Sequence, residues 1–283
     1  MKKLINNILV PVDFGKPSML ALDKAVHMAN HFRCGLHVLH VENSAIIPLT
    51  KDGNFFTAGK QPDKKDNQEK LAQLEDKYFK KVDAGLPCKA VMEKGNTEQV
   101  IVEYSIRNHI DFIVVGKSNR VLLGNLFQSL SINRLARKTN SAIVTVKSKP
   151  AFENIRNIVL PVGTHLPLRK IMFASYLAEK FNARIHLIAL TKRFPVTRVE
   201  DTLYLYKTYQ LLKEKTALSV ECHTIPGANI ADSTLEYAQQ INADLIVVNP
   251  GKELLLSGFI NRMFARFITN ESRIPVMTIA PSQ

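Results

Sequence analysis

The chain has 283 residues, of which 46% are hydrophobic and 22% charged, with 12 glycines and 13 prolines. These values are ordinary for a folded globular protein and exclude a disordered or collagen-like chain. The 38 basic and 25 acidic residues give a net charge of +13, and there is no tryptophan. Because the basic residues are dispersed along the chain, we expect no specific nucleic-acid binding. A basic binding module for nucleic acid or a membrane surface remains an alternative interpretation.

No stretch approaches the roughly 18 apolar residues that a membrane-spanning helix needs, and the first seven residues lack the apolar core of a signal peptide. We therefore expect a cytoplasmic protein that does not bind membranes. Three scattered cysteines, Cys34, Cys88 and Cys222, show no paired spacing. They are predicted to be small buried side chains rather than disulfides or metal ligands.

The chain resembles itself. Three segments recur in the same order in the second half: Asn7 to Asp13 at Asn157 to Gly163, Met28 to Leu39 at Leu177 to Ile188, and Asp111 to Val115 at Asp244 to Val248. Such repetition indicates two copies of one structural unit. We predict two domains, residues 1–148 and 152–283, the first carrying a mobile loop insertion at about residues 42–70. Pro150 disfavours a continuous strand or helix across the junction.

Strands and helices are predicted to alternate within each half. In the first half, apolar runs rich in Val and Ile indicate strands covered on both faces, at residues 8–12, 36–41, 89–93, 112–115 and 142–146. Helical spacing of apolar residues predicts helices at residues 22–32, 71–82 and 100–104. Asn96, followed by Gln99 three residues later, has the spacing of a capping box. Right-handed crossovers then give an α/β fold, an open five-stranded parallel sheet with helices on both faces.

Ligands of such sheets bind at the carboxyl ends of strands, where the strand order reverses. In the first half the residues after the first and fourth strands are Asp13 to Gly15 and Gly116 to Asn119. In the second half they are Gly163 to His165 and Asn249 to Lys252. These segments are the places to look for a ligand site.

Several strings at predicted strands carry a resemblance to a known family: Ile8 to Asp13, His37 to Val41, Asp111 to Gly116, Ser141 to Val146 and Ile274 to Ile279. In their order, spacing and duplication, the chain resembles the universal stress protein family in its tandem form. The resemblance covers essentially the whole chain. It implies two Rossmann-like domains of the adenine nucleotide alpha hydrolase-like type and a role in the stress response.

Nucleotide-binding members of that family hold ATP with an Asp after the first strand, backbone groups at the end of the second, and a glycine motif after the fourth. That motif is Gly, two residues, Gly, nine residues, Gly, then Ser or Thr. Its glycines let backbone N–H groups approach phosphate oxygens closely, beside the positive end of a helix. The resemblance makes these ligand-binding candidates in the first half: Pro11, Asp13, Val41, Gly116, Lys117, Asn119 and Ser129.

The motif is degenerate in the first half, where Asn119 and Ser129 replace two glycines and Leu130 replaces the hydroxyl residue. ATP remains a candidate ligand there, with Lys117 and Arg120 as charge partners. In the second half Gly163 replaces the Asp after the first strand. The four positions that correspond to the glycine motif are occupied by Asn249, Lys252, Arg262 and Met263, so no element of the motif is present. We predict no ligand site in the second half.

Other constellations are predicted to be structural. Asp23, His27 and His31 share one helix face, which we interpret as solvated rather than metal-binding. His37 and His186 occupy equivalent strand positions, which favours a role in the fold, and His40 is interpreted as an ordinary strand-end residue near the site. No nucleophile elbow, phosphate-binding lysine loop or dinucleotide motif is present. We predict no catalytic residues and no metal site. Phe55 and Phe56 in the insertion are candidates for a lid or an interface anchor.

The sequence therefore predicts a non-catalytic tandem universal stress protein that acts through ligand or partner binding. The alternative is an adenine-nucleotide switch or weak ATPase that uses the first half. Since family members commonly pair through their last strands, the resemblance implies internal pairing of Val144 to Val146 with Val276 to Ile279. It also implies a homodimer, and the protein partner is unknown.

Overall fold

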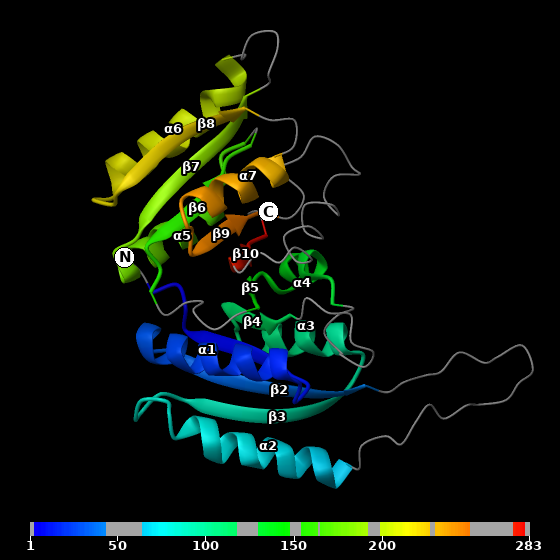
Figure 1. The fold of residues 1–283 in the computed structure, drawn as a ribbon. Coiled ribbons are helices and arrows are strands. Elements are labelled where there is room, and N and C mark those ends of the chain that lie inside the picture. Colours follow the sequence, from blue (N-terminus) through cyan, green and yellow to red (C-terminus); the bar gives the residue numbers. More distant parts are fainter. Residues whose placement is uncertain are drawn as a thin grey trace, which may run out of the picture.

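The computed structural model describes residues 3–43, 64–117, 130–147, 154–163, 165–191, 199–226, 230–249 and 274–280. Strands and helices alternate in both halves (Figure 1). The first half contains β1 (Asn7–Val12), α1 (Lys16–Phe32), β2 (Gly35–Asn43), α2 (Lys64–Phe79), β3 (Cys88–Gly95), α3 (Thr97–Arg107), β4 (Phe112–Gly116), α4 (Ile132–Thr139) and β5 (Ala142–Val146). The second contains β6 (Asn157–Pro161), α5 (Leu168–Phe181), β7 (Arg184–Thr191), α6 (Val199–Lys215), β8 (Val220–Pro226), α7 (Ile230–Gln240), β9 (Leu245–Val248) and β10 (Val276–Thr278).

All these strands belong to one ten-stranded sheet with the order β3-β2-β1-β4-β5-β10-β9-β6-β7-β8. Within each half the paired strands are parallel, and the order is the same when read from the outer edge inward. The order reverses between β1 and β4 and again between β6 and β9. This topology confirms the predicted fold class, which is two copies of an open, doubly wound α/β sheet.

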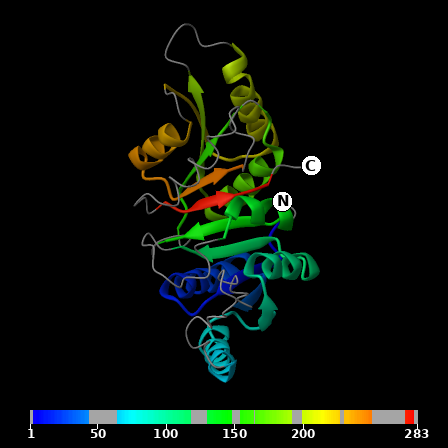
Figure 2. The same ribbon diagram turned by 90° about the vertical axis from the view of Figure 1, so that its right-hand side faces the viewer.

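The two halves join through β5 and β10, the last strand of each. These strands are antiparallel, with Thr145 opposite Val276 and Val144 opposite Met277. Figure 2 shows the arrows of β5 (green) and β10 (red) side by side and pointing in opposite directions. The predicted pairing of the final strands is therefore confirmed, and each strand covers what would be the other's open edge.

Apolar side chains form one core that extends across both halves and two smaller clusters on the other side of the sheet. The large core contains residues of α1, α2, α5 and α6, whereas α3 and α4 pack on one small cluster and α7 on the other. Aromatic rings connect α1 to α5. The ring of Phe32 lies 5.9 Å from that of Tyr176 and 5.8 Å from that of Phe181, centroid to centroid. The halves are thus joined by side-chain packing as well as by the sheet.

An aspartate repeated in both halves fixes the start of the first strand of each. Asp111 Oδ2 accepts hydrogen bonds from the backbone N–H groups of Asn6 and Asn7, at 2.7 and 3.2 Å. Asp244 Oδ2 accepts the equivalent pair from Arg156 and Asn157, at 2.8 and 3.0 Å. These contacts explain why the sequence repeat includes this aspartate. They satisfy backbone donors that the sheet leaves open.

The loop predicted at residues 42–70 has the wrong limits at both ends. Strand β2 continues to Asn43, and α2 begins at Lys64. The first turns of α2 are polar, so apolar spacing gives no helical signal there, but Asp66 and Lys70 form an (i, i+4) ion pair at 2.5 Å. Phe55 and Phe56, and the predicted domain boundary at residues 148–152, lie outside the described residues.

Among the described residues, no helix is long and apolar enough to span a membrane.

The predicted cap of α3 is present. Asn96 Oδ1 accepts a hydrogen bond from the Gln99 backbone N–H at 3.2 Å, but the Gln99 side chain donates to Glu103 rather than closing a capping box. We expect Asn96→Ala to lower the free energy of unfolding by about 1 kcal/mol, the usual loss for a cap of this kind. Urea denaturation measures this loss. Gln99→Ala serves as the control with a smaller effect; equal losses would contradict the assignment.

Candidate functional site

The predicted ligand crevice of the first half is placed where the strand order reverses between β1 and β4, beside the turn from β1 into α1. Asp13 organises this turn: its Oδ1 accepts hydrogen bonds from the Gly15 N–H at 2.9 Å and from the Ser18 hydroxyl at 2.6 Å. Phe14 between them has a φ of 59°, a left-handed conformation that such local bonds support. Asp13, a predicted ligand contact, is thus also a structural residue, and these contacts use only Oδ1.

Gly116 lies on the other side of the predicted crevice, at the end of β4. A Cβ atom on this residue would lie 1.9 Å from the carbonyl oxygen of Pro17 and 2.8 Å from the backbone nitrogen of Ser18. Strand β4 therefore approaches the first turn of α1 more closely than any side chain permits. The glycine that matches the nucleotide motif is required here by packing alone.

Two lysines extend beyond the paired ends of β4 and β5, where Gly116 lies opposite Val146. The Lys117 backbone N–H donates to the Val146 carbonyl at 3.0 Å, and its ammonium lies 3.4 Å from the Leu130 carbonyl oxygen. Burial lowers the pKa of Lys117. Burial, together with the charge of Lys117, lowers the pKa of Lys147 to about 8. The charge of Lys117 thus reaches Lys147, and two neighbouring, partly buried cations form a site that favours an anion.

Sequence reasoning identified Lys117 but missed Lys147, because that residue was assigned to the junction between the halves. The other candidates of the first half are less informative. Pro11 and Val41 are buried within β1 and β2, and His40 Nδ1 lies 2.9 Å from the Val12 carbonyl oxygen, with its ring tilted against Phe14. Asn119, Arg120 and Ser129 lie outside the described residues.

The corresponding place in the second half is arranged differently. Gly163 follows β6 without a carboxylate, and Asn249 is buried at the end of β9. Lys170 on α5 is fully buried, and its ammonium donates to the Pro161 carbonyl at the end of β6. Burial lowers the pKa of Lys170 well below its usual value. Lys252, Arg262 and Met263 lie outside the described residues.

The model of the universal stress protein family matches residues 5–147, which is half of the chain. The chain belongs to the universal stress protein family. It is also 26% identical over 137 residues to the universal stress protein YxiE of Bacillus subtilis, an alignment that covers 45% of this chain and 93% of that one.

Solved structures show that the fold of this universal stress protein extends over both halves. A universal stress protein from Archaeoglobus fulgidus superposes with a TM-score of 0.70 at 15% identity, covering 100% of both chains. A putative universal stress protein from Pseudomonas aeruginosa gives a TM-score of 0.65 at 18% identity, covering 99% of this chain and 94% of that one. At these identities the similarity establishes the fold.

Several histidines of this universal stress protein contact other aromatic or polar side chains. His37 Nδ1 lies 2.9 Å from the Tyr104 hydroxyl, and His186 Nδ1 lies 3.1 Å from the Tyr237 hydroxyl, so the equivalent pair makes equivalent contacts on α3 and α7. On α1, Asp23, His27 and His31 are exposed; the ring of His31 stacks on Phe181 at 4.3 Å. A further group combines Glu221 and His223 with His186, and sequence reasoning missed it.

A cavity of about 620 Å³ lies at the opposite end of the second-half sheet from the crevice. It is lined by residues at the amino ends of β6 and β7 and around the end of α5, among them Arg156, Asn157, Phe181 and Arg184. Its position excludes it from the site predicted at the carboxyl ends of the strands.

Proposed function

We propose that this universal stress protein is a non-catalytic ligand-binding protein of the stress response, and that its first half binds the ligand. The observation that carries this proposal is the pair Lys117 and Lys147 at the carboxyl ends of β4 and β5, beside the strand-order reversal. Two partly buried cations favour an anionic ligand. An adenine nucleotide fits this site, with its phosphates held by the two lysines.

The contrast between the halves supports assigning the ligand to the first. In the second half the carboxylate is replaced by Gly163, and the ammonium of Lys170 is used within the protein, on the Pro161 carbonyl. Lys170 is fully buried, so its ammonium is not accessible to an anion, whereas Lys117 and Lys147 are only partly buried. We therefore expect one ligand per chain.

The arrangement of the first crevice also supports a non-catalytic role. Its hydroxyl and carboxylate, on Ser18 and Asp13, bond to each other at 2.6 Å, and Ser18 is fully buried. Ser18 also donates to the Gly15 carbonyl at 3.0 Å, so its hydroxyl is committed to the turn. A nucleophile needs access to its substrate. We expect ATP incubated with the protein to release ADP at the rate of buffer alone, and a rate above that would contradict this part of the proposal.

Calorimetric titration with ATP, ADP and pyrophosphate tests the site. We expect Lys147→Ala to weaken binding about 10- to 100-fold, because a hydrogen bond to a charged group contributes about 1.5–3 kcal/mol. Lys80→Ala is the matched control, since Lys80 is an exposed lysine paired with Asp76 on α2. The proposal fails if none of these anions binds at millimolar concentration, or if both variants bind equally well.

The same titration has an expected pH dependence. Because the pKa of Lys147 is lowered to about 8, its ammonium is charged below that pH and neutral above it. Anion affinity should be highest near pH 6 to 7 and fall as the pH rises through about 8. Lys147→Arg keeps the charge at every pH used, since the guanidinium pKa exceeds 12. An arginine variant with the same pH profile as the wild type would show that another group titrates.

A further inference from the structure

Three side chains on β7 and β8 converge at the outer edge of the second-half sheet. His186 lies directly opposite Glu221 in the strand pairing, and His223 is two residues beyond Glu221, so all three share one face. Their nearest nitrogen and oxygen atoms all lie within 4.8 Å of one another. Within the part of the chain that the structure describes, this is the one group of three or more potential metal ligands with such spacing. We propose that His186, Glu221 and His223 bind a divalent transition metal ion of the zinc class.

The distances suit a metal. Glu221 Oε2 lies 3.4 Å from His186 Nδ1 and 3.3 Å from His223 Nε2. Ligands bound to zinc at about 2.0–2.1 Å in tetrahedral geometry lie about 3.3 Å apart. Two edges of the coordination polyhedron are therefore already formed. Two imidazoles and one carboxylate are a ligand set that zinc shares with cobalt, nickel and copper.

Neighbouring groups orient the ligands. His186 Nε2 lies 3.2 Å from Asn157 Oδ1, and a proton on Nε2 donated to that oxygen leaves a lone pair on Nδ1. Nδ1 lies 3.1 Å from the Tyr237 hydroxyl, so a bound metal would replace that hydrogen bond. Arg184 donates to Glu221 Oε1 at 2.8 Å, which holds the carboxylate while Oε2 stays directed at both histidines. His186 is 5% exposed, whereas Glu221 and His223 are each 39% exposed. The site thus has a fixed inner ligand and two outer ligands that solvent reaches.

The first half provides an internal comparison. It contains the same histidine–tyrosine contact between His37 and Tyr104, but Lys89 lies opposite His37 in the pairing, and Val91 follows two residues later. The contact between histidine and tyrosine is therefore a feature of the fold, in agreement with the structural role that the sequence predicts for His37 and His186. Glu221 and His223, which create the ligand set, are found in the second half.

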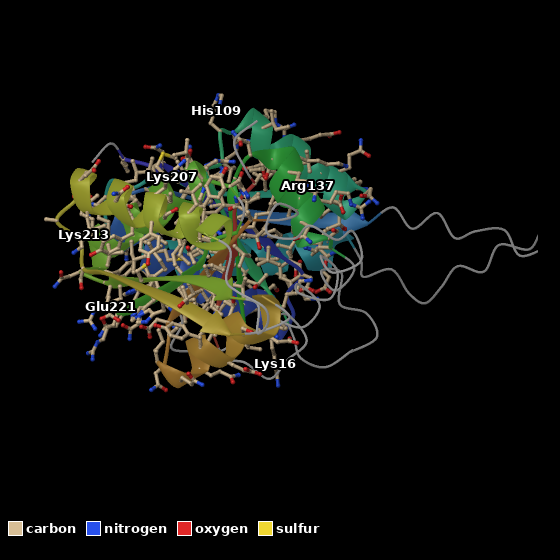
Figure 3. The ribbon with its side chains drawn as sticks, turned by 90° about the horizontal axis from the view of Figure 1, so that it is seen from above. Lys16, His109, Arg137, Lys207, Lys213 and Glu221 are labelled. Atoms are coloured by element: carbon tan, nitrogen blue, oxygen red, sulfur yellow. The ribbon has the colours of Figure 1, made fainter. Side chains whose placement is uncertain are left out.

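The location separates this cluster from the proposed ligand crevice. His186 is near the amino end of β7, while the crevice lies at the carboxyl ends of the strands. Figure 3 shows Glu221 at the margin of the molecule, on the side of β8 away from α6. Strand β8 is the outermost strand at this edge of the sheet among the residues that the structure describes. A metal joining β7 to β8 would fasten this edge, and binding to the folded state alone would stabilise the protein.

The test uses the full chain stripped of metal by a chelator and then titrated with Zn²⁺ by calorimetry and with Co²⁺ by visible absorption. We expect one equivalent per chain, a visible spectrum of low-symmetry, four-coordinate cobalt, and a rise in Tm with Zn²⁺. His223→Val, which introduces the residue type of the first half, should lose the cobalt spectrum and the Tm rise. Glu221→Gln is the second variant, and it changes almost no volume.

The controls separate this site from other histidines. His37→Ala removes the equivalent histidine of the first half, and His27→Ala removes the exposed pair on α1; both should retain one equivalent of metal. Circular dichroism without metal checks that each variant is folded. The proposal is overturned if the wild type binds no Zn²⁺, if His223→Val and Glu221→Gln bind as the wild type does, or if His27→Ala alone abolishes binding.

Discussion

Gly116→Ala should lower the free energy of unfolding by at least about 3 kcal/mol, the upper part of the range for overpacking a close contact. The added Cβ would lie 1.9 Å from the carbonyl oxygen and 2.2 Å from the carbonyl carbon of Pro17. Both atoms are backbone, so no side-chain rotation relieves the clash. Strand β4 or the first turn of α1 must move, and that turn also contains the bonds that hold Asp13. Urea denaturation followed by circular dichroism measures the loss.

Gly85→Ala is the matched control. Gly85 has a φ of +87°, but a Cβ there would meet no atom within 4 Å. The cost of this variant is conformational alone, about 1 kcal/mol. If Gly116→Ala lowers the free energy of unfolding by no more than Gly85→Ala does, the close approach of β4 to α1 is not rigid, and the packing explanation for Gly116 fails.

This packing role changes how the degenerate motif is interpreted. Gly116 is the one motif glycine present in the first half, and the sequence interpretation treats it as a remnant of phosphate binding. Because β4 needs a glycine there for any ligand state, Gly116 by itself gives no support to nucleotide binding. A Gly116 variant that fails to bind ATP would be equally explained by local unfolding. Lys147, which is partly exposed and directly follows β5, is the better position for testing nucleotide binding, because its substitution is not expected to disturb the fold.

Strand positions could be predicted because buried parallel strands are nearly continuous apolar runs, and the sequence repeat supported the first, second and fourth strands of each half. The pairing of β5 with β10 was predicted from family resemblance rather than from the residues. The start of α2 could not be predicted from apolar spacing, since its first turns from Lys64 are polar and stabilised by charge pairs. The burial pattern therefore predicted whether a segment is a strand or a helix, but not the residues at which it begins and ends.

The site was less predictable because it depends on register and on side-chain burial. Lys147 lies next to Lys117 only because Gly116 is opposite Val146, a pairing that the sequence does not state. Glu221 and His223 are two residues apart, so both side chains lie on the same face of β8. When β8 pairs with β7, both lie beside His186. The spacing alone is common, and no sequence signal selects the partner strand.

Lys170 was missed because a lysine in the first turn of a helix is expected to be exposed. The repeat contains the corrective signal. Pro17 and Pro167 occupy equivalent positions, so Lys170 corresponds to Leu20, which packs partly buried against the core. An apolar residue at one copy of a position indicates that the other copy is buried too.

Lys170→Leu, which introduces the residue type of the first half, is expected to raise the free energy of unfolding near pH 7. Replacing a buried ion pair by apolar side chains of similar volume is neutral or stabilising by about 1–4 kcal/mol, and we expect the same direction for the fully buried Lys170. The leucine also leaves the Pro161 carbonyl without its ammonium donor, which reduces the gain. Urea denaturation of both proteins measures the net effect, with Lys80→Leu as the exposed control.

The pH dependence of that difference identifies its cause. The pKa of Lys170 is well below its usual value in the folded state and about 10.4 in the unfolded chain. Between these values the unfolded state binds one more proton, so the wild type gains stability as the pH rises. The advantage of Lys170→Leu should therefore be largest at low pH and shrink toward pH 10. A difference that is the same from pH 6 to pH 10 would mean that Lys170 remains charged in the folded protein, and the loss of its charge on burial would not be the cause of the stability difference.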